Sequence, residues 1–285
     1  MDYSMYAKFA RAVRDRGIEP MADYAKSLGF TSVEFFDFVS PDWQEVVPSL
    51  EDARRYRAVL EKRGLHVACY SVAAGLYDPS APNGIDAYAE KKLMQYVDRA
   101  VALGSPFLHH TITLGLEGMP IPYEKMLATV LPAVVRVAKY AASCGIACLY
   151  EDQGLYFNGV EGFRGFFEAV RAEEPSVGIC GDIGNTLFVD ESPVDFFRTF
   201  AHEFRHVHIK DYVPCKKEDA GSAVTKGGHY VKEAMIGRGM IDTVSCLQIL
   251  KEVGYTGAIA FENNHEEDFA AGVRIGMELV DSILM

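Results

Sequence analysis

The chain has 285 residues, and its 40 acidic against 28 basic side chains give a net charge of −12 at pH 7. This charge repels phosphate backbones and anionic membrane surfaces, so nucleic acid and membranes are not expected as partners. The length is enough to bury one large core, and we expect a single domain over residues 1–285.

Targeting signals and disulfides are not expected from the sequence. The first residues lack a basic segment followed by an apolar run, and we see no later apolar run that approaches a membrane span. The sequence therefore predicts a cytoplasmic protein. The six cysteines are scattered, mostly within apolar runs, and are expected to be buried thiols.

Helices and strands are predicted to alternate along the chain. Ser49 with Asp52 resembles a capping box, Gly64 and Gly104 end helices, and Ser192-Pro193 supplies an N-cap followed by proline at the first helical position. The predicted strands cover residues 3–7, 32–37, 65–72, 106–111, 146–151, 177–182, 205–211 and 258–262. The predicted helices cover residues 20–29, 49–63, 86–103, 123–143, 162–172, 192–202 and 242–253, with a last one from about 266.

This alternation favours a single (β/α)8 TIM barrel. The strands are near-continuous apolar runs, which is typical of a parallel sheet buried on both faces. A doubly wound open sheet is the second choice, but no G-x-G-x-x-G follows the first strand. Residues 213–235 are expected to form a long loop with a cluster of lysines, in which Gly227-Gly228 would allow movement as a lid.

Four potential metal ligands lie at the carboxyl ends of the last four predicted strands. They are Glu151, Asp182, His208 and Glu262, one from each strand. In a barrel these ends converge on one mouth, where active sites lie. Three crowded carboxylates would raise one another's pKa unless a cation neutralised them. Oxygen donors with one imidazole suit Mn²⁺, Mg²⁺ or Co²⁺, and Zn²⁺ remains possible.

The chain resembles the xylose-isomerase-like TIM barrels, which include sugar phosphate isomerases, ketose 3-epimerases and inosose dehydratases. The resemblance is carried by segments spread over the whole chain: 28–34, Tyr150-Glu151, Gly181-Asp182-Ile183-Gly184-Asn185, 206–211, Ile236-Gly237-Arg238-Gly239, 254–257 and Phe261-Glu262. It implies that Glu151, Asp182, His208 and Glu262 bind one divalent metal. It also implies that Glu151 and Glu262 flank the substrate as an acid/base pair.

Further side chains are expected to contact the substrate at the same mouth. Lys210 shares a strand face with His206 and His208, while Arg238 follows the lysine-rich loop. One of the adjacent His109 and His110 should point into the mouth, because neighbouring strand residues face opposite ways; we assign this role to His109. Asn185 stands where many ketose epimerases have histidine, and it can still hydrogen-bond a hydroxyl.

These features predict an isomerase or epimerase that moves a proton at the carbon next to a carbonyl through an enediolate. A metal-dependent lyase acting on a keto-sugar or keto-inositol is the first alternative. A non-catalytic sugar-binding or partner subunit is the second. The expected partner is a small sugar or sugar derivative, and the sequence leaves its identity, its phosphorylation and any homo-oligomer open.

Overall fold

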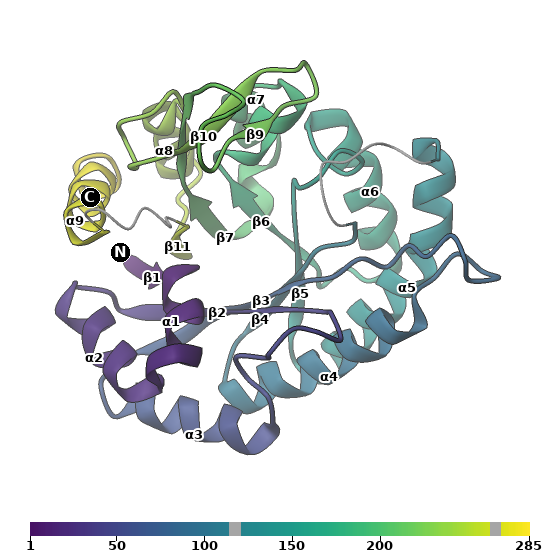
Figure 1. Cartoon of the computed structure of the whole chain (residues 1–285), viewed down its shortest axis with the longest axis horizontal. Helices are drawn as coiled ribbons and strands as arrows, with labels where there is room; N and C mark the ends of the chain where they lie inside the picture. The colour runs from purple at the N-terminus through teal and green to yellow at the C-terminus, as the bar shows by residue number, and fades with distance from the viewer. Residues whose placement is uncertain (114–120, 263–268) are drawn as a thin grey trace.

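Eight parallel strands close into a barrel in the computed structural model, which describes residues 1–113, 121–262 and 269–285 (Figure 1). Around the barrel the order is β1-β11-β7-β6-β5-β4-β3-β2. The strands are β1 (Asp2–Met5), β2 (Ser32–Phe38), β3 (His66–Ala73), β4 (Phe107–His110), β5 (Ala147–Glu151), β6 (Gly178–Asp182), β7 (Phe204–Ile209) and β11 (Ala258–Phe261). The predicted (β/α)8 barrel is confirmed, and the doubly wound sheet is excluded.

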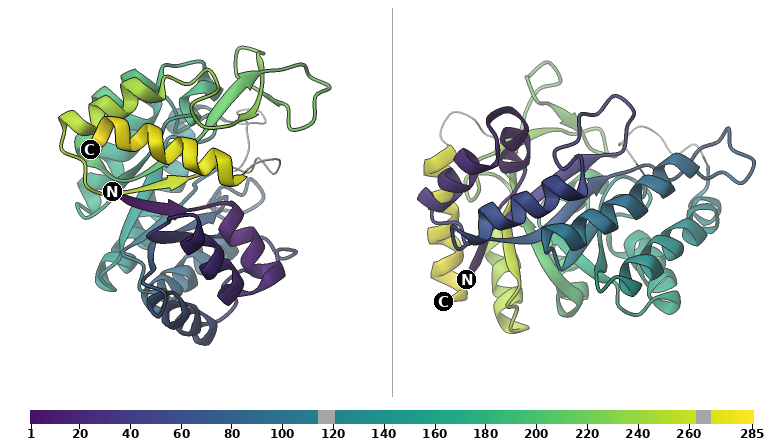
Figure 2. Two further views of the ribbon diagram at one scale, coloured as in Figure 1. Left: turned by 90° about the vertical axis from the view of Figure 1, so that its left-hand side faces the viewer. Right: turned by 90° about the horizontal axis from the view of Figure 1, so that it is seen from below.

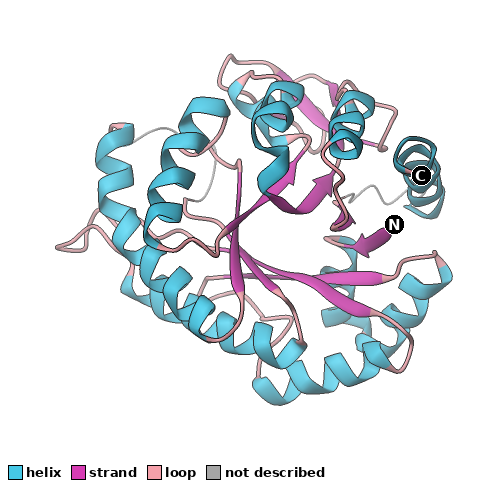
Figure 3. Ribbon diagram, turned by 180° about the vertical axis from the view of Figure 1, so that it is seen from behind, coloured by secondary structure: helices cyan, strands magenta, loops and turns pink. Residues whose placement is uncertain are grey.

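Helices form the outer layer of the barrel (Figures 1 and 3). They are α1 (Lys8–Arg16), α2 (Ile18–Ser27), α3 (Leu50–Glu61), α4 (Ala87–Leu103), α5 (Tyr123–Ser143), α6 (Val160–Glu173), α7 (Pro193–Phe200), α8 (Thr243–Glu252) and α9 (Phe269–Leu284). The predicted capping signals hold: the Asp52 amide donates to Ser49 Oγ at 3.0 Å, and Gly104 ends α4 in the left-handed conformation. The predicted start of the last helix, near residue 266, lies outside the described residues.

The sequence prediction missed α1. It precedes α2 directly, with only Gly17 between the two helices, and Gly17 has φ +88. This left-handed conformation, which glycine adopts without steric cost, turns the chain from one helix into the next. Helix α2 begins at Ile18, so Pro20 lies within its first turn rather than at its first residue, the position predicted from the sequence.

A small antiparallel sheet replaces the predicted long loop over residues 213–235. It has the order β8-β10-β9, formed by β8 (Asp211–Pro214), β9 (Ala223–Val224) and β10 (Tyr230–Ala234). The predicted strand 205–211 therefore divides: the barrel strand ends at Ile209, and the chain leaves the barrel at Lys210. This sheet extends from the end of the barrel opposite the two termini (Figure 2).

The main apolar core fills the layer between the barrel and its helices, where Phe163, Phe166, Phe167 and Phe196 are fully buried. The barrel interior is different, because Cys69, Leu149 and Cys180 form a separate small cluster there. The six cysteines are free thiols, as expected.

Helix α5 is long and apolar enough to cross a membrane by length and composition alone, a candidate that the sequence inspection did not identify. It contacts α4, α6 and β5, so it occupies the place of an outer barrel helix.

Candidate functional site

The structure brings the four predicted metal ligands together at the mouth of the barrel. Glu151 and Asp182 end β5 and β6, His208 lies in β7, and Glu262 directly follows β11. One ligand atom from each of the four lies within 4.8 Å of the others. Parallel pairing explains the convergence, because Asp182 pairs with His208 across β6 and β7 and their side chains share the interior face.

The Nδ1 atom of His208 lies at the centre of this cluster. It is 2.7 Å from Glu151 Oε1, 3.5 Å from Glu262 Oε2 and 3.9 Å from Asp182 Oδ2. The ring of Tyr6 stacks on the His208 imidazole, with 4.7 Å between the ring centroids. Tyr6 was not predicted as part of the site, since the predicted strand 3–7 gave no reason to distinguish it from packing residues.

Lys210 places an ammonium group between two of the carboxylates. Its Nζ is 3.0 Å from Asp182 Oδ2 and 3.0 Å from Glu262 Oε2, and only the contact with Glu262 has hydrogen-bond alignment. Asp182 Oδ1 accepts the backbone N–H groups of Gly184 and Asn185 at 2.7 and 2.8 Å. The other oxygen, Oδ2, is buried and has no hydrogen-bond partner among the described residues. A buried oxygen in this state fits a divalent cation, as does the set of three carboxylates and one imidazole.

The two glutamates of the cluster have pKa values that move in opposite directions. Burial and the charge of Asp182 raise the pKa of Glu262 to about 7, although Lys210 opposes this shift. Burial acts in the same direction on Glu151, but His208, His109 and Lys210 together outweigh it and hold the pKa of Glu151 below its ordinary value. Burial raises the pKa of Asp182, with Lys210 opposing. The site thus combines an ionised glutamate with one that titrates near neutral pH.

The two histidines at the end of β4 face opposite ways, as predicted, and His109 is the one that faces the cluster. His109 is 3% exposed, and its Nε2 lies 3.9 Å from Glu151 Oε2. His110 faces away from the cluster, with its ring edge-on to Tyr150 and its Nδ1 3.0 Å from the carbonyl of Thr111. Burial lowers the pKa of His109 to about 4, so its imidazole is neutral at pH 7.

A cavity of about 270 Å³ opens beside the cluster. Its lining includes Lys210 and Glu262 from the cluster, together with Asn185, Phe188 and Tyr212; Ala73, Thr111, Thr113, Gln153 and Gly154 complete it. Such a volume fits a small polar molecule. Asn185, one of the predicted substrate contacts, therefore lies in the cavity wall, and its buried Nδ2 has no partner among the described groups.

Arg238 lies elsewhere. It is exposed, in the turn that follows β10, and it is not one of the residues that line the cavity. The buried carboxylate of Asp211 fixes this turn by accepting the N–H groups of Gly237, Gly239 and Ile241 at 2.8–3.1 Å. The role of Arg238 in substrate binding stays a prediction, and its position outside the cavity lining adds no support to it.

The predicted mobile lid is attached to the barrel. The side chain of Asp190 accepts the hydroxyl of Thr225 at 2.7 Å and the N–H of Gly227 at 2.5 Å. The N–H of Lys226 donates to the carbonyl of Phe188 at 2.9 Å, and Phe188 packs edge-on against Tyr212. The small sheet therefore forms a wall of the cavity in contact with the 3-10 helix η1 (Asn185–Val189) and the residue after it, and its movement as a lid stays a prediction.

Sequence reasoning also missed Glu34, a fully buried carboxylate on β2. Its Oε2 lies 2.6 Å from His206 Nε2, and its Oε1 lies 3.1 Å from His208 Nε2. In the barrel order β2 and β7 are separated by β1 and β11, so these contacts cross the barrel interior. The available signal was a strand of mainly apolar residues that also contains two acids, Glu34 and Asp37. The sequence does not show that Glu34 faces His206 and His208, and this position is what makes it part of the site.

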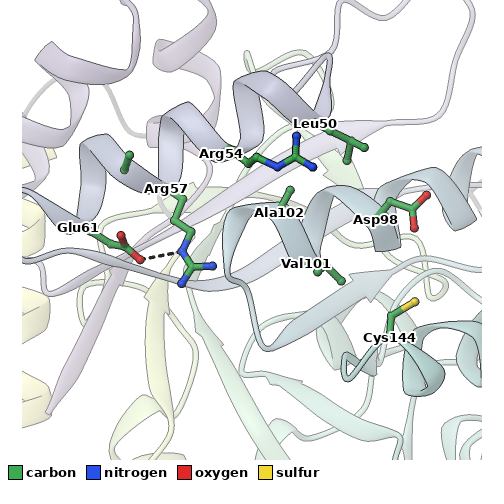
Figure 4. Close-up of a pocket in the computed structure, with 9 residues that line it drawn as sticks. Leu50, Arg54, Arg57, Glu61, Asp98, Val101, Ala102 and Cys144 are labelled. Atoms are coloured by element: carbon green, nitrogen blue, oxygen red, sulfur yellow. Dashed lines mark hydrogen bonds and ion pairs between the residues drawn. The ribbon is translucent and has the colours of Figure 1, made fainter.

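A larger hollow, of about 660 Å³, lies on the outer layer and away from the mouth (Figure 4). It is open to solvent between α3 and α4, with Arg54 and Arg57 on one side and Asp98 on the other. Arg57 forms an ion pair with Glu61 at 2.7 Å. Without a cluster of reactive groups, this hollow carries no comparable chemistry.

Known proteins share the sequence pattern and the fold. A family model described as a xylose isomerase-like TIM barrel matches residues 22–283. An inosose dehydratase from Clostridium botulinum (strain Alaska E43 / Type E3) is 28% identical over 101 residues, a match that covers 34% of this chain and 34% of that protein.

Two solved structures show how closely the fold is shared. The D-psicose 3-epimerase of Clostridium cellulolyticum H10, solved with D-tagatose, has a TM-score of 0.74 and 17% identity, covering 100% of this chain and 99% of that one. The IolI protein, solved with a bound zinc atom, has a TM-score of 0.74 and 13% identity, covering 100% and 98%. At these identities the two structures are similar in fold.

Proposed function

The chain belongs to the xylose isomerase-like TIM barrel family, and we propose that it is a divalent-metal-dependent isomerase or epimerase acting on a small sugar or sugar derivative. The reaction would move a proton at the carbon next to a carbonyl. The observation that carries this proposal is the pair Glu151 and Glu262. They lie in one cluster, with one pKa lowered and the other raised to about 7. Separated pKa values are what acid and base roles require.

Four residues would hold the cation: Glu151, Asp182, His208 and Glu262. The support is their mutual approach within 4.8 Å and the buried Oδ2 of Asp182, which contacts the Lys210 ammonium at 3.0 Å but has no aligned hydrogen bond among the described residues. When bound, the metal supplies Lewis-acid polarisation of the substrate oxygens. Manganese, magnesium or cobalt would suit the oxygen-rich donor set, and the zinc in the IolI structure keeps zinc open for this chain.

The proton transfers would fall to the two glutamates. Glu151, ionised at neutral pH, is the acceptor for the proton on the α-carbon. Glu262 titrates near neutral pH and is suited to return a proton at the other side of the enediolate. The ammonium of Lys210, 3.0 Å from Glu262, would offset negative charge that develops on the substrate oxygen.

The position of reprotonation decides the product. Return to the opposite face of the same carbon gives an epimer, and return to the neighbouring carbon gives an aldose or ketose isomer. Exclusion of water by the walls of the cavity would protect the enediolate in either case.

A lyase is the second candidate, and the local match to an inosose dehydratase favours it. The same first step, removal of the α-proton, would lead to loss of a β-hydroxyl instead of reprotonation. The groups needed are the same ones, with Glu262 protonating the departing hydroxyl.

Solvent deuterium separates these reactions. The protein would be incubated with Mn²⁺ in D₂O and a panel of ketoses, aldoses and inososes, and followed by proton NMR. An isomerase or epimerase exchanges the α-hydrogen and forms an isomer, and a lyase forms a dehydrated product. The Glu262→Gln variant should lose turnover by about 10²-fold or more, whereas Glu218→Gln on the exposed surface of the small sheet should not.

Two results would contradict the proposal. One is purified protein that binds no divalent metal, together with full activity of Glu262→Gln. The other is sugar binding with neither exchange nor product for any compound of the panel, which would indicate a non-catalytic sugar-binding protein.

A further inference from the structure

Glu34 contacts three groups inside the barrel, and each of them carries a proton to donate. The ring nitrogens are His206 Nε2, 2.6 Å from Oε2, and His208 Nε2, 3.1 and 3.2 Å from the two carboxylate oxygens. The third donor is the hydroxyl of Ser71, on β3, which donates to Oε1. An ionised carboxylate accepts only, so each of these three contacts places its hydrogen on the partner.

This arrangement fixes a hydrogen on Nε2 of His208, so Nδ1 is the ring atom that can meet a cation. In the structure Nδ1 lies 2.7 Å from Glu151 Oε1, a distance that places a hydrogen on Nδ1 as well, and a cation would take the place of that hydrogen. The Nδ1 atom faces Glu151, Asp182 and Glu262. A carboxylate behind a ligating histidine is a common way to fix both tautomer and ring orientation.

The same carboxylate acts on His109 through Ser71. Because the Ser71 hydroxyl hydrogen is directed to Glu34, its oxygen accepts from His109 Nδ1–H at 2.9 Å. His109 Nε2 is then left as an acceptor, and it is buried without a hydrogen-bond partner among the described groups. It lies 3.9 Å from Glu151 Oε2, a second acceptor. A hydrogen-bond donor placed between these two acceptors would satisfy both.

We propose that Glu34 is a positioning residue that sets the tautomers of both His208 and, through Ser71, His109, so that a cation meets Nδ1 of one and a substrate hydroxyl donates to Nε2 of the other. The cation half of this inference rests on the proposed function. The tautomer half stands on the hydrogen-bond geometry alone. The hydroxyl would be shared between His109 and Glu151, so the site would favour a substrate with a hydroxyl donor at this position.

Nitrogen-15 NMR of the histidine rings, recorded without metal, tests the tautomer of His109 and the Nε2 hydrogens of His206 and His208. Free histidine prefers Nε2–H, so Nδ1–H on His109 is a distinctive signature, assigned by loss of the signal in His109→Gln. We expect Nδ1–H in the unmodified protein. In Ser71→Ala, His109 should revert to Nε2–H while His206 keeps its Nε2–H. In Glu34→Gln the signals of all three network histidines should change.

Manganese binding provides the second measurement. Glu34→Gln should weaken the affinity for Mn²⁺ by roughly 10- to 100-fold, the range for loss of such outer partners, whereas Ser71→Ala should stay near the unmodified value. Asp37→Asn is the matched control, since this buried carboxylate on the same strand binds Tyr70, Trp43 and the amides of Val46 and Val47 and no site histidine. It should leave the tautomers unchanged.

An Nε2–H tautomer on His109 in the unmodified protein would overturn the inference, as would Glu34→Gln with unchanged ring signals. If Glu34→Gln fails to fold, the unmodified spectrum and Ser71→Ala decide the question. Absence of Mn²⁺ binding with the expected tautomers would remove the proposed function and keep the role of Glu34 in setting the tautomers.

Discussion

The ammonium of Lys210 lies 3.0 Å from Oε2 of Glu262, inside the cluster proposed to bind a divalent metal. Only 6% of the Lys210 side chain is exposed, and burial of an ammonium is costly unless it is paired. Lys210 therefore neutralises part of the acidic cluster. A divalent cation at the same carboxylates would compete with it electrostatically.

This competition predicts that Lys210→Met gains more stability from metal than the unmodified protein does. Without metal, the variant should lose on the order of 3 kcal/mol, because the buried carboxylates lose a partner. Saturating Mn²⁺ should restore most of this loss. Thermal melts in EDTA and in Mn²⁺ measure both effects, with Lys232→Met on the partly exposed Lys232–Asp219 pair as the control. Equal metal stabilisation of Lys210→Met and the unmodified protein would contradict the prediction.

Two adjacent acids at the mouth should differ in their effect on metal content. Asp182→Asn should remove most of the bound metal, because Asp182 is one of the four residues whose ligand atoms lie within 4.8 Å of one another and Asp152 is not. Asp152→Asn should retain the metal. Burial and the charge of Asp182 raise the pKa of Asp152 well above its ordinary value, which favours the protonated acid, and the amide of asparagine resembles that acid. Metal analysis after dialysis compares the two. Loss of metal in Asp152→Asn alone would reverse the assignment.

The convergence of the four proposed ligands was predictable, because the ends of parallel strands meet at one mouth whatever the details of packing. The role of Glu34 was not predictable. It depends on contacts with His206 and His208, which lie more than 170 residues later in the chain and across the barrel. A charged residue in an alternating strand gives the same pattern whether it faces solvent or an interior partner.

The small sheet was unpredictable for a related reason. The segment from His206 to Asp211 continues one alternating pattern, although the barrel strand ends at Ile209 and β8 begins at Asp211. Strand β9 has only two residues, too few to give a periodic signal. Asp190 contacts two residues between β9 and β10, Thr225 and Gly227, which follow it by 35 and 37 residues.

At the opposite end of the barrel, Asp2 and His66 form an ion pair with 3.0 Å between Oδ2 and Nε2. Burial would raise the pKa of Asp2, but hydrogen bonds from His66, Thr31 and Ser32 lower it to about 2. The hydrogen bond with Asp2 raises the pKa of His66. The pair connects β1 to β3 at the amino ends of the strands.

These shifts predict a pH window for the pair. The contribution of Asp2 is complete above its unfolded pKa of about 3.9 and is lost as the pH falls toward 2. The contribution of His66 is complete below about 6.5 and is lost as the pH rises through its raised pKa. Urea unfolding should therefore show His66→Gln destabilised most near pH 5.5, by under about 1 kcal/mol because the pair is partly exposed. A larger deficit at pH 8.5 would contradict this.

Attachment of the small sheet through Asp190 can be tested by proteolysis. Asp190 has φ +61, a left-handed conformation that glycine and asparagine tolerate. Substitution by either residue therefore changes the side-chain contacts without adding backbone strain. Asp190→Gly relieves the backbone and removes both contacts with Thr225 and Gly227, and Asp190→Asn keeps an acceptor oxygen. Trypsin should cleave Asp190→Gly after Lys216, Lys217 or Lys226 about tenfold faster, corresponding to about 1.4 kcal/mol of lost attachment, with Asp190→Asn in between. Unchanged cleavage of Asp190→Gly would mean that the antiparallel pairing, rather than Asp190, holds the sheet in place.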